Sequence, residues 1–171
     1  MLLIMVFTIK SFSQSLTELE RNPSFKGITI GAPIGKYSDI LTFSHTSQAG
    51  NVYHVSQESY LSIFHIKMQN MLVVERHGKV YSIFLEKYYP ANNSGAMEFN
   101  PNELLVLFSE LKTKYGDKFF DLDDTNRTPS VCGMRWKANS VALEIVYLFY
   151  GTFVDKRPRL SYNLYQLEDD Y

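Results

Sequence analysis

The chain has 171 residues, of which 45% are hydrophobic, and its 17 Lys and Arg are balanced by 18 Asp and Glu. This length and composition are typical of one folded domain and exclude a mostly disordered chain. The near-zero charge argues against a nucleic-acid partner, and the single cysteine, Cys132, excludes an intramolecular disulfide. The 12 Phe and 12 Tyr favour β-strands.

Residues 1–14 differ from the rest of the chain. Met1 to Ile9 are almost all apolar, Lys10 follows, and the small polar stretch SFSQ ends at Gln14. This pattern predicts a signal peptide over residues 1–14 and a single domain over 15–171, located in the periplasm or secreted. A buried N-terminal strand is the alternative. Because a membrane-spanning helix needs roughly 20 apolar residues and this run has about nine, we expect no membrane span.

Two helices are predicted before residue 42. Residues 15–22 begin with capping-box spacing, which predicts a short helix. Pro33 is typical of a first helical residue, and apolar side chains follow it at three- and four-residue spacing: Ile34, Tyr37 and Leu41. These features predict an amphipathic helix over residues 33–41.

Residues 52–89 alternate between apolar and polar side chains, which predicts three antiparallel strands. The dipeptide His77-Gly78 is typical of a tight hairpin between the last two of these strands. Residues 90–101 are rich in turn-forming side chains and predict a surface loop, which is an alternative surface for holding a protein partner.

The clearest predicted element is a helix that begins at Asn100 and ends at Gly116. Asn100 can cap the helix, Pro101 suits its first position, and Glu103 has the spacing of a capping box. Its apolar stripe consists of Leu104, Leu107, Phe108, Leu111 and Tyr115. An irregular acidic segment and three further strands follow, the strands in VCGMRWK, SVALEIVYLFY and RLSYNLYQL.

This order predicts an α+β fold in which a unit of one helix and three strands occurs twice. The six strands would form one antiparallel sheet with the helices packed on one of its faces. Four stretches, GITIGAPIGKYSDIL, GKVYSIFLEKY, ELLVLFSELKTKYG and the strand of Trp136, resemble the layout of small exported bacterial proteins. These proteins are similar to the beta-lactamase inhibitory protein and to outer-membrane assembly lipoproteins of the BamE type. The resemblance implies a protein-binding module without catalysis, although the lipid-bearing cysteine of the BamE type is absent.

Motifs for chemistry are weak in this sequence. There is no G-x-S-x-G, the four histidines do not share metal-ligand spacing, and DLDDTN lacks the glycine of a calcium loop. We therefore predict no catalytic residue, no metal and no cofactor. Two alternatives to a binding module remain: an inhibitor or immunity-type protein against one enzyme, and a hydrolase that uses scattered residues such as His65, His77 and Glu86.

Strand alternation predicts which face would bind a partner. If Cys132, Met134 and Trp136 face the helices, side chains on the same strand and its neighbours point the other way. The predicted binding residues are Arg135, Lys137, Glu144, Asn163 and Tyr165. Arg and Tyr are among the residues that dominate the energetics of protein interfaces, although a polar sheet face simply exposed to water would look the same.

Overall fold

A computed structural model describes residues 14–89, 100–123, 130–149 and 158–168. Residues 1–13 of the predicted signal peptide and residues 90–99 of the predicted surface loop lie outside the described residues. The α-helices are α1 (Gln14–Arg21) and α2 (Pro101–Tyr115), and the short 3-10 helices are η1 (Ile34–Tyr37) and η2 (Glu58–Tyr60). The first six strands are β1 (Ser24–Phe25), β2 (Ile28–Thr29), β3 (Leu41–Ser47), β4 (Gly50–Val55), β5 (Ser62–Ile63) and β6 (Ile66–Lys67). The other six are β7 (Asn70–Arg76), β8 (Lys79–Tyr88), β9 (Phe120–Asp121), β10 (Ser130–Lys137), β11 (Val141–Phe149) and β12 (Arg159–Gln166).

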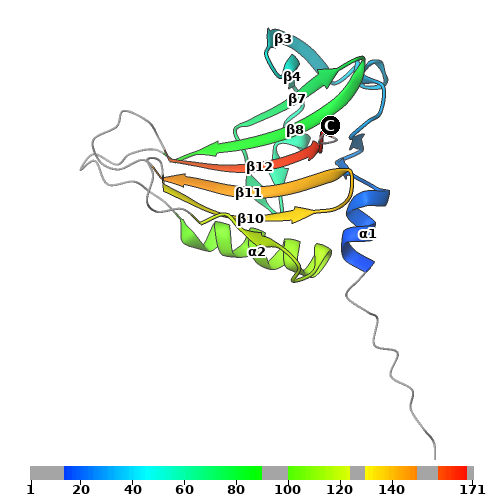
Figure 1. The fold of residues 1–171 in the computed structure, drawn as a ribbon. Coiled ribbons are helices and arrows are strands. Elements are labelled where there is room, and N and C mark those ends of the chain that lie inside the picture. Colours follow the sequence, from blue (N-terminus) through cyan, green and yellow to red (C-terminus); the bar gives the residue numbers. More distant parts are fainter. Residues whose placement is uncertain (1–13, 90–99, 124–129, 150–157, 169–171) are drawn as a thin grey trace, which may run out of the picture.

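Eight of these strands form one antiparallel sheet. Their order across the sheet is β3-β4-β7-β8-β12-β11-β10-β9. Figure 1 shows this sheet as a curved surface, with α2 running beside β10 and α1 near the end of β10 and the start of β11. The pairing of β8 with β12 joins the strands before α2 to those after it.

The predicted fold class, α+β with tandem helix-plus-three-strand units and helices packed on one face, is wrong. Strands make up about half of the described residues, and each half of the sheet has four strands. Residues 33–41 do not form an amphipathic helix, because η1 ends at Tyr37 and β3 begins at Leu41. Gly35 lies inside this segment, and glycine is a poor helix former, so three apolar residues at helical spacing are not enough. The protein is therefore β-rich, with only two α-helices among its described residues.

The hydrophobic core lies on one face of the sheet. Here the sheet packs against α1, α2 and two small hairpins, β1–β2 and β5–β6, which take the place of the predicted helix. Trp136 is fully buried, and its indole N–H donates to the Gly116 carbonyl at 2.9 Å. The largest fully buried side chains also include Leu19, Met68, Ile83, Leu107, Leu111, Leu143 and Ile145.

The predicted helix after residue 100 is confirmed as α2. The Asn100 side chain accepts a hydrogen bond from the Asn102 N–H at 3.1 Å, and Gly116 ends the helix at a φ of 82°. The carboxylate of Glu103, which the sequence predicted to complete a capping box, instead accepts hydrogen bonds from Lys87 at 2.6 and 2.7 Å and from Tyr89 at 2.8 Å. These bonds fasten the start of α2 to β8.

The two edges of the sheet differ in length. β3 forms one edge, where residues 42–46 are exposed and Phe43 is 57% exposed. Its sequence, LTFSHTS, contains no Asp, Glu, Lys or Arg. The other described edge is β9, which has only two residues.

Three hairpins have two-residue loops in which both residues have positive φ, as in type I′ turns. They are Lys26-Gly27, with φ of 48° and 86°, Phe64-His65, with 45° and 68°, and His77-Gly78, with 52° and 77°. The last confirms the predicted hairpin. Phe64-His65 has no glycine, so both of its residues hold a backbone conformation that side chains disfavour.

We expect His65→Gly to stabilise the protein by about 0.5–1 kcal/mol. A left-handed conformation costs a residue with a side chain about 1–2 kcal/mol, which exceeds the entropy cost of about 0.5–1 kcal/mol for a new glycine. Urea denaturation of both proteins measures the difference in the free energy of unfolding.

The matched control is His54→Gly in β4, where no positive φ is present and the same substitution should destabilise. A loss of stability in the His65→Gly variant would show that the turn is not strained.

Candidate functional site

The candidate site is the face of the sheet opposite the core, which we call the open face. Paired residues of antiparallel strands lie on the same side, so the register identifies its members on four neighbouring strands. The hydrophobic core cluster contains none of them. They are Ser82, Phe84, Glu86 and Tyr88 on β8; Arg159, Ser161, Asn163 and Tyr165 on β12; Ala142, Glu144, Val146 and Leu148 on β11; and Val131, Gly133, Arg135 and Lys137 on β10.

The structure brings the five predicted binding residues together on two adjacent rows of the open face. One row runs Arg135, Glu144, Asn163 across three strands, and the next runs Lys137, Ala142, Tyr165. Cys132, Met134 and Trp136 pack against the core, as the alternation predicts. The placement of these residues on one face was therefore predictable, and their binding role stays a prediction.

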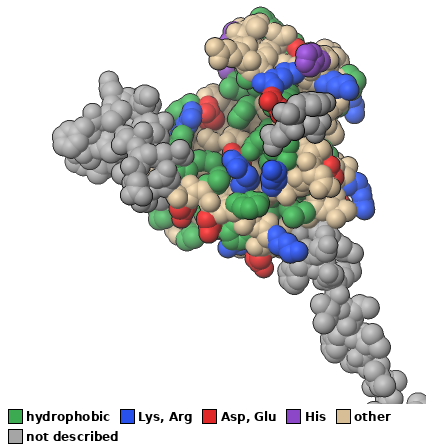
Figure 2. All heavy atoms as spheres, viewed as in Figure 1, with side chains coloured by type: hydrophobic (Ala, Val, Ile, Leu, Met, Phe, Trp, Pro, Cys, Tyr) green, Lys and Arg blue, Asp and Glu red, His purple; other side chains and the backbone are tan. Residues whose placement is uncertain are grey.

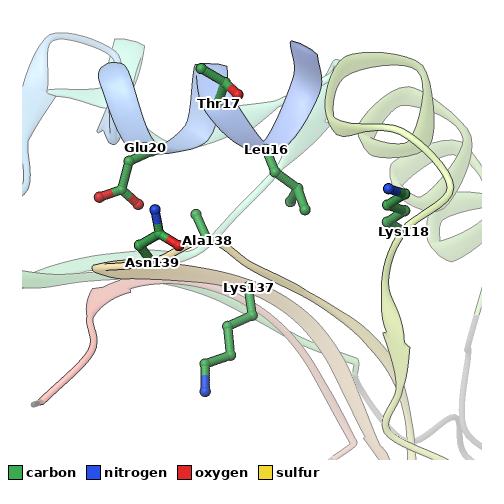
Figure 3. Close-up of a pocket in the computed structure, with 7 residues that line it drawn as sticks. All are labelled: Leu16, Thr17, Glu20, Lys118, Lys137, Ala138 and Asn139. Atoms are coloured by element: carbon green, nitrogen blue, oxygen red, sulfur yellow. The ribbon is translucent and has the colours of Figure 1, made fainter. Parts of the chain in front are cut away.

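A cavity lies on the core side of β10, opposite the open face. It has a volume of about 280 Å³ and lies between α1 and the turn after β10. In Figure 3, Lys137 points away from α1, to the other side of β10. Glu20 of α1 accepts hydrogen bonds from the Ser140 hydroxyl at 2.6 Å and the Ser140 N–H at 3.0 Å, which lower the pKa of its carboxyl.

The centre of the open face is a cluster of Arg135, Glu144 and Tyr165. The Arg135 guanidinium donates to the Glu144 carboxylate, and the Tyr165 hydroxyl donates to the same oxygen at 2.7 Å. The Glu144 side chain is only 12% exposed, whereas that of Arg135 is 40% exposed. Burial and the bond to Glu144 raise the pKa of Tyr165. The carboxylate therefore acts as a buried anchor that fixes an arginine and a tyrosine at the surface.

The same combination of residue types occurs twice more on the sheet. Glu86 accepts from Arg159 at 2.9 Å and from the Tyr88 hydroxyl at 3.0 Å. Near the β7–β8 hairpin, Glu168 accepts from Arg76 and from the Tyr81 hydroxyl, and the Arg76 guanidinium lies 4.0 Å from the centre of the Tyr81 ring.

Sequence reasoning missed these two clusters for different reasons. Glu86 and Tyr88 share a strand face, so alternation could have grouped them. Their partner Arg159 lies 73 residues from Glu86 and joins them only through the pairing of β8 with β12. Glu168 follows the last strand, where no periodic pattern applies.

The residues suggested for a hydrolase are not brought together. His65 lies in the turn between β5 and β6, and His77 lies in the turn between β7 and β8. They line two separate cavities, one beside the start of α2 and one beside Gly50 and Arg76. Glu86 points onto the open face, where its carboxylate binds Arg159 and Tyr88.

The described residues offer little for metal binding or thiol chemistry. Among them, no three His, Cys, Asp or Glu side chains gather as metal ligands would. Burial, then the charge of Asp123, raises the pKa of the Cys132 thiol to about 11, so this thiol is protonated near neutral pH. None of the described helices has the length and apolar character needed to cross a membrane.

Comparison with known proteins gives no relative. No family model, no curated protein and no solved structure matches this chain.

We predict that the stability of the protein falls above about pH 10, the usual pKa of tyrosine. The folded pKa values of Tyr165 and Tyr162 are raised mainly by burial, and that of Tyr147 is raised to about 12. A raised pKa means that the folded state retains protons that the unfolded state releases, so its stabilisation is complete below pH 10 and is lost as the pH rises through the folded values.

Denaturant unfolding at pH 8 and pH 11 measures this loss. Tyr165→Phe should lower stability at pH 8 by about 1 kcal/mol, because one hydrogen bond is lost, and should make the fall toward pH 11 smaller. An identical fall in both proteins would mean that Tyr165 does not contribute to it.

Proposed function

We propose that this chain is an exported, non-enzymatic binding module that holds a protein partner on its open face. The observation that carries the proposal is the repeated cluster of one Arg, one Glu and one Tyr. Arg and Tyr are enriched at the positions that contribute most to protein interfaces, and the open face presents each of them in two such clusters.

The clusters would lower the cost of binding. A free arginine or tyrosine side chain loses conformational entropy when it is fixed at an interface, about 0.5–1.5 kcal/mol for each side chain. Arg135 and Tyr165 are already held by one carboxylate, and Arg159 and Tyr88 by another. The open face would therefore meet a partner with part of this ordering already complete.

The charge pattern favours a protein over a nucleic acid or an anionic membrane. Each arginine of the two clusters on the open face is paired with a glutamate, so the face carries no strong field of one sign. Figure 2 shows charged side chains of both signs among hydrophobic ones on the side that it draws. Mixed surfaces of this kind, with Phe84 among the polar groups, match the composition of protein interfaces.

Export is part of the proposal and rests on the first fourteen residues. The apolar run Met1 to Ile9 and the small polar stretch that ends at Gln14 support a cleaved signal peptide and a periplasmic or secreted location. The absence of a second cysteine is compatible with an oxidising compartment, because no disulfide could form within the chain.

The test is affinity capture from envelope extract, followed by measurement of binding to the purified partner. The variant Lys137→Glu/Asn163→Arg reverses one charge and adds bulk between the clusters, and it leaves Arg135, Glu144 and Tyr165 in place. We expect at least a tenfold increase in the dissociation constant, since 1.4 kcal/mol is a factor of about ten and interface hot spots exceed this value.

The matched control is Lys118→Glu/Asn102→Arg, which makes the same chemical changes at two exposed positions. Lys118 lies between α2 and β9, and Asn102 lies in the first turn of α2. A partner that is retained by this control and lost by the open-face variant supports the proposal. Equal binding by both variants would place the interface elsewhere, and no captured partner would contradict a binding function. If the partner is an enzyme that loses activity in the complex, the module is an inhibitor or immunity-type protein.

A further inference from the structure

A second site lies on the core side of the sheet, between the two small hairpins and α2. It is a cavity of about 240 Å³, which we call the hairpin pocket. The β1–β2 hairpin contributes Phe25, the β5–β6 hairpin contributes Ile63 and Phe64, and α2 contributes Leu111. The pocket therefore combines an aromatic and aliphatic part with polar groups, as is usual for small-molecule sites.

Two lysines give this apolar pocket a positive character. Lys26 and Lys114 both line it, and none of its lining residues is Asp or Glu. The Lys26 ammonium donates to the Ser62 hydroxyl at 2.8 Å and to the Ser59 carbonyl, which holds it across the gap between the hairpins. Its pKa is lowered by desolvation, because neither of these neutral partners compensates its charge. A ligand with a negative charge would supply the missing counter-charge.

Two buried tyrosines also line the pocket. Tyr115 and Tyr162 are each only 3% exposed. The hydroxyl of a tyrosine is a hydrogen-bond donor. A carboxylate oxygen within the pocket would accept hydrogen bonds from such donors.

The backbone of the β5–β6 hairpin gives an independent indication. Phe64 lines the pocket and has a φ of 45° in a turn that contains no glycine. Disfavoured backbone conformations of this kind persist where the surrounding structure holds them, and they cluster at ligand-binding sites. Here the turn places an aromatic ring against the pocket, which Asn-Gly, the usual turn sequence, would not do.

We propose that the hairpin pocket binds a small carboxylate with an apolar body, such as a single aromatic ring on a short acid chain. A cavity of about 150 Å³ is large enough for benzene, so the volume of this pocket suits one ring with a short substituent. The ring would lie among Phe25, Ile63 and Phe64, and the carboxylate would lie near the two lysines and the tyrosine hydroxyls. This site is separate from the open face, because the sheet lies between them.

Calorimetric titration of the full protein with 3-phenylpropanoate tests the proposal. Two probes of similar size serve as comparisons: 3-phenylpropanol, which is neutral, and 3-phenylpropylamine, which is positive at neutral pH. We expect the carboxylate to bind at least tenfold more tightly than the alcohol, the amine to bind least, and added salt to weaken the binding of the carboxylate.

Variants of the lysines locate the site. Lys26→Gln and Lys114→Gln should each weaken binding of 3-phenylpropanoate about tenfold or more, with little change in binding of the alcohol. The matched control is Lys112→Gln, two residues away on α2, whose ammonium lies 4.6 Å from the centre of the Phe119 ring outside the pocket. Tyr162→Phe should weaken binding of the carboxylate and leave an apolar pocket for the alcohol.

Three results would overturn the inference. They are an absence of saturable binding at millimolar carboxylate, equal affinity for the acid and the alcohol, and equal effects of Lys112→Gln and the two pocket variants. Each can be distinguished from failure of the proposed protein-binding function, because the open-face variants leave the hairpin pocket intact.

Discussion

The pairing of β8 with β12 is the constraint on which the rest of the structure depends. It runs from Arg159 opposite Tyr88 to Tyr165 opposite Ser82, and it is the pairing that connects the two halves of the eight-stranded sheet. On the core side it places Tyr162 beside Leu85 and Leu164 beside Ile83. On the open side it adds the bond between Arg159 and Glu86. One set of backbone hydrogen bonds therefore organises both the core and the candidate site.

The two faces of this sheet differ in chemistry and in what covers them. The core face is apolar and needs cover, which the two helices supply only in part, so the β1–β2 and β5–β6 hairpins complete it. The hairpin pocket forms where these separate pieces meet. On the open face, glutamates that are largely buried hold arginines and tyrosines in place. Small neighbours such as Ala142 and Ser82 are themselves buried, shielded by the bulkier side chains beside them.

Local patterns predicted a good part of this structure. Alternation identified β10, β11 and β12 and the face of each residue on them, and the capping residues identified α2. The prediction failed over residues 33–41, where helical spacing was present and Gly35 weakened the helix. It also missed the hairpin at Phe64-His65, since that turn has no glycine to mark it.

The candidate site was predictable only within one half of the sheet. Arg135, Glu144 and Tyr165 lie on three strands that follow one another in the chain and pair in the same order, so alternation alone grouped them. The cluster of Glu86 and Arg159 depends on a register between distant segments, which no local pattern contains. The hairpin pocket depends on tertiary packing of four elements, and its residues have no common spacing in the sequence.

The unequal edges of the sheet limit how copies of this protein could associate. An edge strand exposes unpaired N–H and C=O groups, and β3 carries none of the charged side chains or prolines that usually discourage strand addition. The opposite edge, β9, is only two residues long and offers little backbone to a neighbour. Among the described residues, β3 is therefore the longer of the two edge strands. Two copies that paired through β3 would form a symmetric dimer, in which each copy covers the free edge of the other.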